Sequence, residues 1–459
     1  NAQGTSATDG VAVGSPTWVY DAYSVDVYDN STTTDGTFTV TQGKVEGKAL
    51  TSLAFDDTDD YVTLGSNSIG TNHSISAWVK VTADSDNKTI FDFRDANNDG
   101  ILVWSRADEG LEYQLNSVDA TSTATGLAGF WIHVIGCYDG TTQKLFINGV
   151  LDASNTTSQT VSVSTDAFIG ARSHTGRANF FNGNIRDLKI FDYALSDEQA
   201  ASLYSGTYPQ TPQYWYKLDE GSGTAVEDHG TATDIDGTIN SATYTNGTLD
   251  LDGALTVAAN GTMSCPRGNL TIDTTLDINC TTVADQWIHN NGKVISTYNG
   301  LQSWFPNGAI FYDVEINGQT GNAVKIHENM TILNTLFLNN TNSYFDMMQG
   351  ATVTMGSATA TTVAEGGAIT IGNTAQYLRF RIDGASPTKL HGASNLYPCI
   401  ITGIANQIDF DKGVSDTAHI KNLDIRFDIT TGGAGCTIQL DGDCEFDAVT
   451  VSNDDTLDL

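Results

Sequence analysis

The sequence has few prolines, few basic residues and no long apolar run, and each shortage excludes a class of protein. Only 7 of the 459 residues are proline, whereas 45 are glycine. Lys and Arg total 21 against 55 Asp and Glu, which gives a formal net charge of -34. A surface this negative repels phosphates, so we expect neither nucleic acid nor an anionic membrane as a partner. No stretch approaches the roughly 20 apolar residues that span a bilayer, so we expect no membrane insertion.

The motifs of common catalytic and metal centres are also missing. No HExxH, HxH, GxSxG or P-loop occurs, and the cysteines form no CxxC. Two cysteine pairs, Cys265 with Cys280 and Cys436 with Cys444, are close enough in sequence to be bridged, and buried free thiols are the alternative. We therefore predict that the protein is not an enzyme.

Short apolar runs separated by Thr, Ser, Asn, Asp and Gly predict an all-β chain. Trp131–Tyr138 ends at Asp139-Gly140, and Lys144–Ile147 ends at Asn148-Gly149. Asp-Gly and Asn-Gly are strong hairpin signals, so consecutive antiparallel strands are expected here. One short helix is expected at Leu195–Tyr204, which has a Ser cap and apolar residues at helical spacing.

Four stretches of the first half, in order, resemble the laminin-G-like family of concanavalin A-like lectins. They are Gly47–Val62, Ser74–Lys80, Trp131–Gly149 and Gly183–Ser196. The resemblance implies a jelly-roll sandwich over residues 17–208, after a linker or arm at 1–16. Residues 209–236 form a connector that resembles the start of a second such domain. This fold hosts binders of sugars, proteins and calcium, so the resemblance is specific for fold and weak for ligand.

Residues 237–459 repeat short apolar-polar-apolar triplets such as Leu249–Leu251, Leu270–Ile272 and Leu423–Ile425. Such triplets, separated by turn residues and without helices between them, predict a β-solenoid or stacked β layers, with a second sandwich as the alternative. This half loosely resembles the β-rich stalks of phage fibre and decoration proteins and of bacterial adhesins. The apolar edges of a stacked rod need covering, so we expect a homo-oligomer such as a trimer.

Two acidic segments are candidates for a Ca²⁺ site. In Asp95-Ala96-Asn97-Asn98-Asp99-Gly100, the ligand candidates are Asp95, Asn97 and Asp99, because oxygen ligands at alternate positions before a Gly wrap around Ca²⁺. A polar hairpin turn is the alternative. The second is the carboxylate cluster of Asp56, Asp57, Asp59 and Asp60, in which Asp56 and Asp59 are the ligand candidates and which Asp187 is expected to join. The alternative there is a solvated acidic turn.

Exposed aromatic rings and loop cations are candidates for ligand binding, since sugars stack on aromatic faces. Trp104, Trp287 and Trp304 lie in polar surroundings, whereas Trp78 and Trp131 match core positions of the family. Arg172, His174 and Arg177 precede the last family motif in a segment expected to be a loop.

These features predict an extracellular surface protein with a lectin-like domain for adhesion or glycan recognition. By analogy alone, we favour a virion decoration or fibre protein of a phage. Its expected partners are a glycan or cell-surface receptor and other proteins of the particle. A secreted or cell-surface bacterial adhesin is one alternative. A polysaccharide-active enzyme, a β-helix lyase or hydrolase with an accessory binding domain, is the other.

Overall fold

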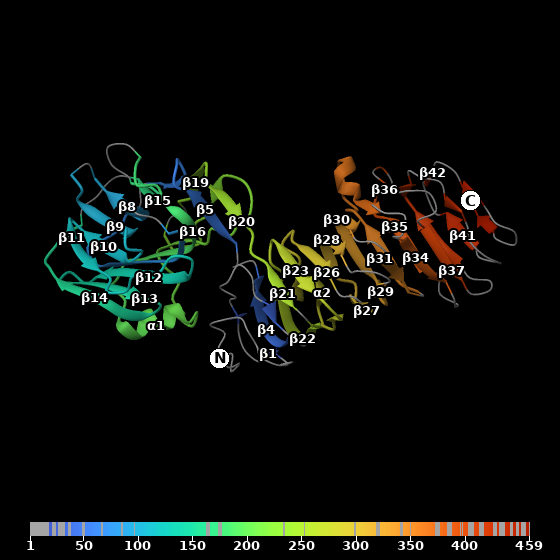
Figure 1. The fold of residues 1–459 in the computed structure, drawn as a ribbon, viewed down its shortest axis with the longest axis horizontal. Helices are drawn as coiled ribbons and strands as arrows, with labels where there is room; N and C mark the ends of the chain where they lie inside the picture. The colour runs from blue at the N-terminus through green and yellow to red at the C-terminus, as the bar shows by residue number, and fades with distance from the viewer. Residues whose placement is uncertain are drawn as a thin grey trace. The chain divides into compact units, whose positions relative to one another are not determined.

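The computed structural model divides into two compact units (Figure 1). The sandwich unit comprises residues 49–246, and the parallel-sheet unit comprises residues 1–48 together with 247–459. The structure describes residues 18–20, 24–25, 33–34, 38–47, 51–65, 68–83, 86–95, 97–161, 166–172, 177–232, 235–251, 253–297, 300–317, 322–339, 343–348, 350–371, 377–382, 388–394, 396, 398–402, 408–412, 417–425, 429–430, 437–440, 444–446, 449–450 and 456–458.

The sandwich unit consists of two antiparallel sheets. The first has the order β11 (Val118–Thr121), β10 (Leu111–Leu115), β9 (Gly100–Ser105), β8 (Lys88–Arg94), β15 (Ala167–Ile169), β6 (Tyr61–Leu64), β19 (Gly237–Asn240), β18 (Ala225–Val226). The second has the order β14 (Val150–Thr156), β13 (Thr142–Ile147), β12 (Trp131–Tyr138), β7 (His73–Val81), β16 (Asn182–Phe191), β5 (Ser52–Asp56), β20 (Thr243–Thr245), with β17 (Tyr214–Tyr216) beside β16. Alternate residues of both sheets, such as Val79 and Phe93, fill the core between them.

Helix α1 (Asp197–Tyr204) covers a second, smaller core on the other face of β12 and β16. Ile135 and Phe191 contribute to it from the strands, and Ala200 and Leu203 contribute from the helix. The predicted helix is confirmed, and Ser196 is its N-cap. Both predicted hairpins are present, since β13 pairs antiparallel with β12 and with β14. At the Asn148-Gly149 turn both residues have positive φ, at 51° and 76°, whereas at Asp139-Gly140 only Gly140 does.

The sandwich starts and ends later than the sequence predicts. Strand β4 (Phe38–Glu46) falls within the predicted sandwich range, but it pairs in parallel with β22 (Leu255–Ser264) of the other unit. Conversely, β17 to β20 fall beyond residue 208 and pair with sandwich strands, for example β19 with β6. The connector that resembles a second domain therefore completes the first one. The sandwich unit is inserted between β4 and β21 (Leu249–Leu251).

Every strand pairing that the structure describes within the parallel-sheet unit is parallel, and the chain alternates between two main sheets. One has the order β1 (Trp18–Tyr20), β4, β22, β24 (Leu276–Ile278), β27 (Gln302–Phe305), β29 (Asn322–Ile326), β31 (Ser343–Met347), β34 (Tyr377–Ile382), β37 (Ile408–Lys412), with β2 (Ser24–Val25) beside β4 and β25 (Trp287–Ile288) beside β22. The other has the order β3 (Thr33–Thr34), β21, β23 (Asn269–Ile272), β26 (Lys293–Ser296), β28 (Ile310–Ile316), β30 (Met330–Leu338), β32 (Thr352–Met355), β35 (Thr388–Gly392), β38 (Thr417–Lys421), β41 (Thr437–Leu440), β44 (Thr456–Asp458).

Further elements complete this unit. A branch from β30 runs through β33 (Ala368–Ile371), β36 (Cys399–Thr402), β39 (Leu423–Ile425) and β42 (Glu445–Phe446), and β40 (Ile429–Thr430) pairs with β43 (Val449–Thr450). The helices are α2 (Val283–Gln286) and the short 3-10 helix η2 (Val363–Gly366).

The apolar positions of the predicted triplets line the core of the parallel-sheet unit. Leu270 pairs with Leu249 on one side and Val294 on the other, so like residues repeat from strand to strand. All three are buried in one continuous core. The β-solenoid stays a prediction, whereas the parallel pairing that it requires is observed within the described residues.

Several sequence predictions about the chain as a whole can be compared with the described residues. No helix among them is long and apolar enough to cross a membrane. Cys265 and Cys280 are buried free thiols, so the disulfide alternative for this pair is wrong. Cys436 lies outside the described residues, so its pairing with Cys444 stays a prediction.

Candidate functional site

An open pocket of about 650 Å³ lies on the sandwich unit, where four chain connections come together. Its lining residues come from the turn after β5, the segment before β8, the turn after β9 and the segment before β16. They are Asp57, Asp86, Asn87, Lys88, Ala107, Asn179 and Phe180. Loops held on a rigid scaffold are frequent positions for binding groups. Pockets that bind small molecules have volumes of about 300 to 1,000 Å³, and this one falls within that range.

Hydrogen bonds between the connections hold the pocket wall in place. The Lys88 ammonium lies 2.5 Å from Asp57 Oδ1. Asn179 Nδ2 donates to the Asn87 carbonyl at 2.9 Å, and the Ala107 amide donates to Asn87 Oδ1 at 3.2 Å. Each connection is therefore tied to another, so the lining groups need little rearrangement to meet a ligand.

Asp57 adopts a backbone conformation that is uncommon for a residue other than glycine, with φ at 70°. Its amide donates to the Phe181 carbonyl at 3.0 Å, which ties the turn after β5 to the segment before β16. The neighbouring Asp56 accepts the Thr58 amide at 2.9 Å, as expected for an Asx turn. This local strain lies at the pocket wall, where such conformations often accompany binding function.

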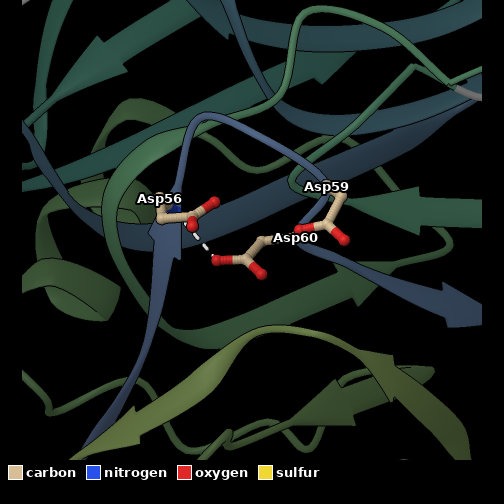
Figure 2. A group of neighbouring side chains, drawn as sticks. All are labelled: Asp56, Asp59 and Asp60. Carbon is tan, nitrogen blue, oxygen red and sulfur yellow. Dashed lines mark hydrogen bonds between the residues drawn. The ribbon is translucent and has the colours of Figure 1, made fainter.

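The same turn carries the acidic group formed by Asp56, Asp59 and Asp60 (Figure 2). One carboxylate oxygen from each lies within 4.8 Å of the others. Asp60 is buried and accepts the Asp56 amide at 2.8 Å. Burial is the main cause that raises the pKa of Asp60, and the charges of Asp56 and Asp59 add to it against that hydrogen bond. Carboxylate oxygens are ligands that Ca²⁺ prefers, so these side chains fit the ion, and its binding stays a prediction.

Asp187 does not join that group, which corrects the expectation from the sequence. It lies at an irregularity of β16, with φ at 53°. Its carboxylate receives a hydrogen bond from Lys189 Nζ at 2.5 Å and another from Trp215 Nε1 at 2.6 Å. Burial opposes ionisation, but Lys189 and Trp215 outweigh it, and the pKa of Asp187 is lowered. Asp187 is therefore a partner of Lys189 and Trp215.

The Asp95 segment forms the turn between β8 and β9. Asp95 Oδ1 accepts the amides of Asn97 at 2.8 Å and Asp99 at 3.0 Å, and the Asp95 amide donates to the Asp99 carbonyl. These bonds close a polar hairpin, as the alternative interpretation expects. Calcium binding by Asp95, Asn97 and Asp99 stays a prediction.

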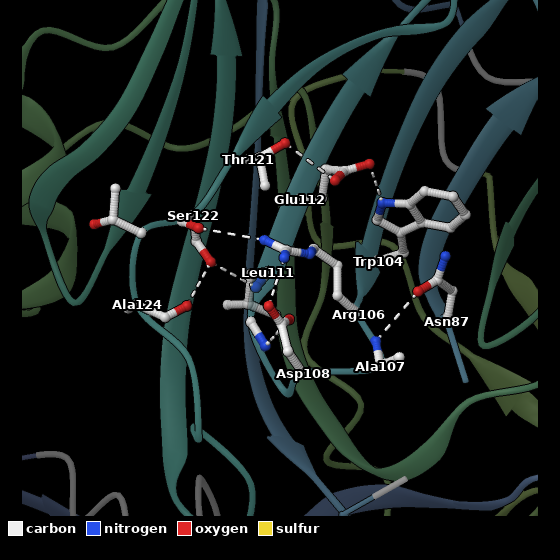
Figure 3. A network of polar contacts seen from close by, with 12 residues as sticks. Asn87, Trp104, Arg106, Ala107, Asp108, Leu111, Glu112, Thr121, Ser122 and Ala124 are labelled. Atoms are coloured by element: carbon white, nitrogen blue, oxygen red, sulfur yellow. Dashed lines mark hydrogen bonds and ion pairs between the residues drawn. The ribbon is translucent and has the colours of Figure 1, made fainter. Parts of the chain in front are cut away.

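Trp104 is half-buried on β9 within a polar network (Figure 3). Its indole Nε1 donates to Glu112 Oε1 at 2.7 Å, and Thr121 Oγ1 donates to Glu112 Oε2 at 3.1 Å. Burial, followed by the charge of Asp119, raises the pKa of Glu112 against these hydrogen bonds. Asn87 and Ala107, which line the pocket, appear in the same view as Trp104 in Figure 3.

The loop cations predicted to bind a ligand have different positions. Arg172 donates to Asn179 Oδ1 at 3.4 Å and to Asn98 Oδ1 at 3.3 Å, so it supports one wall of the pocket. The Arg177 guanidinium lies over the Phe168 ring, 3.7 Å from its centroid. His174 lies outside the described residues.

Trp287 and Trp304 cannot act as exposed stacking platforms, which corrects the prediction. Trp304 is 0% exposed and Trp287 is 3% exposed, and both belong to the core of the parallel-sheet unit. Their indole groups are satisfied internally, by Gln302 Oε1 for Trp304 and by the Ile310 carbonyl for Trp287. The polar residue Ser303 occupies the alternate position of β27, whereas Gln302 shares the buried face with Trp304.

Most of the pocket residues were not among the sequence candidates. Asp86, Asn87 and Lys88 immediately precede or begin β8, and Asn179 and Phe180 precede β16. Only their contacts across the fold bring them together. The sequence signal nearest to the pocket is the acidic run around Asp57.

Residues 56–201 match the family model of the concanavalin A-like lectin/glucanases superfamily. The predicted resemblance is thus confirmed for this segment, which is a concanavalin A-like domain. The comparison with curated proteins found no match.

Solved structures give further likenesses. A protein from Bacteroides ovatus with a suggested carbohydrate-binding role is 17% identical, with a TM-score of 0.34, over 42% of this chain and 59% of that one. A heptameric SAP-like pentraxin from Limulus polyphemus is 17% identical, with a TM-score of 0.30, over 35% of this chain and 85% of that one. The CBM40 of an IT-sialidase from Ruminococcus gnavus, solved with α2,3-sialyllactose, is 16% identical, with a TM-score of 0.28, over 34% of this chain and 98% of that one.

Proposed function

We propose that the sandwich unit binds glycans through the pocket lined by Asp57, Asp86, Asn87, Asn179 and Phe180. The observation that supports it most is that residues with carboxylate, amide and aromatic side chains line one open pocket. Sugar hydroxyls donate to carboxylate and amide oxygens, and the apolar face of a sugar ring stacks on an aromatic side chain. The family match over residues 56–201 is consistent with this role.

A glycan array with the full chain, followed by titration calorimetry of the glycans that bind, tests the proposal. Phe180→Ala should weaken binding at least tenfold, because it removes the stacking surface. Phe130→Ala is the matched control, since Phe130 is 67% exposed and does not line the pocket. Equal affinities of the two variants, or no glycan bound by the wild-type chain, would refute the assignment.

For the whole protein we propose a non-enzymatic role at an extracellular surface, as a virion decoration or fibre protein, with a bacterial adhesin as the alternative. The long series of parallel strands supports a scaffolding role for the second unit. Finding the chain at a fixed copy number in purified particles supports the virion role. Its recovery only from cell surfaces or culture medium supports the adhesin. We also propose a homo-oligomer, and a monomer in light scattering would refute that proposal.

The runner-up is a polysaccharide-active enzyme. Incubation of the full chain with a panel of polysaccharides, followed by an assay for new reducing ends, separates it from the proposed binding role. A steady rise in reducing ends would support the enzyme hypothesis. An unchanged level of reducing ends together with measurable binding would support the lectin hypothesis.

A further inference from the structure

We infer that this pocket takes uncharged or positively charged saccharides and rejects anionic ones such as sialosides and uronates. The inference rests on the proposed glycan-binding function and names the ligand class of the same site. The supporting observations are the charged residues that line the pocket and the charged residues in the turn that contains Asp57.

The charged lining residues are two carboxylates and one ammonium, those of Asp57, Asp86 and Lys88. Lys88 is the cation that an anionic sugar would need, but its ammonium is 2.5 Å from Asp57 Oδ1 and its side chain is only 8% exposed. An anionic ligand would have to compete with Asp57 for this ammonium. The Asp86 carboxylate, on an exposed residue, adds a further negative charge to the pocket.

The surroundings carry charges of both signs, and their exposed carboxylates lie in the turn that carries Asp57. Asp56 and Asp59 are exposed and share a turn with Asp57. On the other side, Arg172 is half-buried behind Asn179, and its guanidinium donates to Asn179 Oδ1 and Asn98 Oδ1. Arg106, near Ala107, forms an ion pair with Asp108.

An anionic group in the pocket would therefore be repelled by the lining carboxylates, and salt screens this repulsion only partly at separations shorter than the Debye length of about 8 Å. A neutral sugar has no such cost, and its hydroxyls can donate to the Asp and Asn oxygens. An ammonium group on an amino sugar gains attraction from the same carboxylates.

Matched pairs of oligosaccharides test the inference with the full chain. The pairs are lactose with 3′-sialyllactose, galacto-oligosaccharides with oligogalacturonides, and chitin oligomers with chitosan oligomers. Within the pairs that bind, we expect the anionic member to bind at least tenfold more weakly than its neutral partner. We expect the chitosan affinity to fall as salt is raised, because salt screens the attraction.

Asp86→Lys should reduce the discrimination against the anionic member at least tenfold, whereas Asp285→Lys should not alter it. Asp285 is the control because it is also exposed but lies on α2 of the other unit. Tighter binding of an anionic member than of its neutral partner by the wild-type chain would overturn the inference and leave the glycan-binding function intact. If no saccharide of any charge binds, the proposed function itself fails.

Discussion

His133 is a titratable side chain enclosed between aromatic rings. It is 1% exposed, its Nε2 lies 2.8 Å from Ser76 Oγ, and its ring centroid is 5.0 Å from that of Trp78 and 6.0 Å from that of Tyr204. Burial, and second the Lys189 ammonium, lower the pKa of His133 to about 3 against the opposing charge of Asp187. The imidazole is therefore neutral in the folded protein at every pH near neutrality.

This lowered pKa predicts a loss of stability in acid. Between the ordinary value of 6.5 and about 3, the unfolded chain binds a proton at this position that the folded chain does not. Stability therefore falls as the pH falls through this window. Replacing His133 by Gln removes this difference in proton binding. Between pH 7 and pH 5 the variant should therefore lose about 2 kcal/mol less unfolding free energy than the wild-type protein. Urea unfolding of both proteins at the two pH values measures the difference, and identical losses would contradict it.

Single residues also show where sequence reasoning fails. Trp104 and Trp304 both occupy strands with polar neighbours, yet Trp104 is half-buried beside Glu112 and Trp304 is fully enclosed. The alternation of a strand indicates which residues share a face, but not which face meets a core. For the same reason, the pocket residues Asn87 and Asn179 could not be paired in advance, because their contact joins segments 92 residues apart.

At the scale of elements, a structural feature could be predicted where its sequence signals lie within a few residues of each other. The N-cap of α1 is one of them. Gln199 donates its amide to Ser196 Oγ at 3.2 Å, and the Ser196 amide donates back to Gln199 Oε1 at 2.8 Å. This capping box satisfies amides that the first helical turn leaves without partners.

Removing the cap should loosen the helix. Ser196→Ala should lower the stability of α1 by about 1 kcal/mol. The amide hydrogens of residues 197–204 that exchange through local opening of the helix should then exchange with solvent about fivefold faster. Ser222→Ala is the control because Ser222 is exposed and lies outside the helix. Hydrogen exchange followed by mass spectrometry measures both variants, and unchanged exchange in Ser196→Ala would contradict the role of the cap.

Pairings between distant segments were not predictable from local pattern. Phe38 and Leu255 occupy matching positions on β4 and β22, although the whole sandwich unit lies between them in the chain. The apolar alternation of β4 fits either unit equally well. In the same way, Tyr214-Trp215-Tyr216 resembles the opening of a new domain, but it pairs with Leu188–Ile190 of the first one.

At the scale of the whole molecule, the boundaries at residues 49 and 246 predict that the sandwich unit folds by itself. Its first and last strands are neighbours, since Ser52 pairs with Thr245. A fragment of residues 49–246 should therefore give an antiparallel β circular-dichroism spectrum and a cooperative thermal transition.

A shorter fragment, residues 49–208, provides the matched comparison. It lacks β17 to β20 and so exposes the edges of β5 and β6, which carry the buried residues Leu53 and Val62. We expect it to aggregate or to melt at a clearly lower temperature than residues 49–246. Equal melting temperatures of the two fragments would refute the observed boundary.

The paired entry and exit of the sandwich unit has a consequence for how such chains diversify. Gly47 closes β4 against the backbone of residues 264–266, so closely that an added Cβ would lie 2.5 Å from the Pro266 nitrogen. The chain segment that leads into the sandwich unit is therefore packed against the parallel-sheet unit, to which it belongs. A different domain whose two ends lie side by side could be inserted at this position. It would replace the sandwich unit and its proposed glycan pocket, while the parallel strands keep their register.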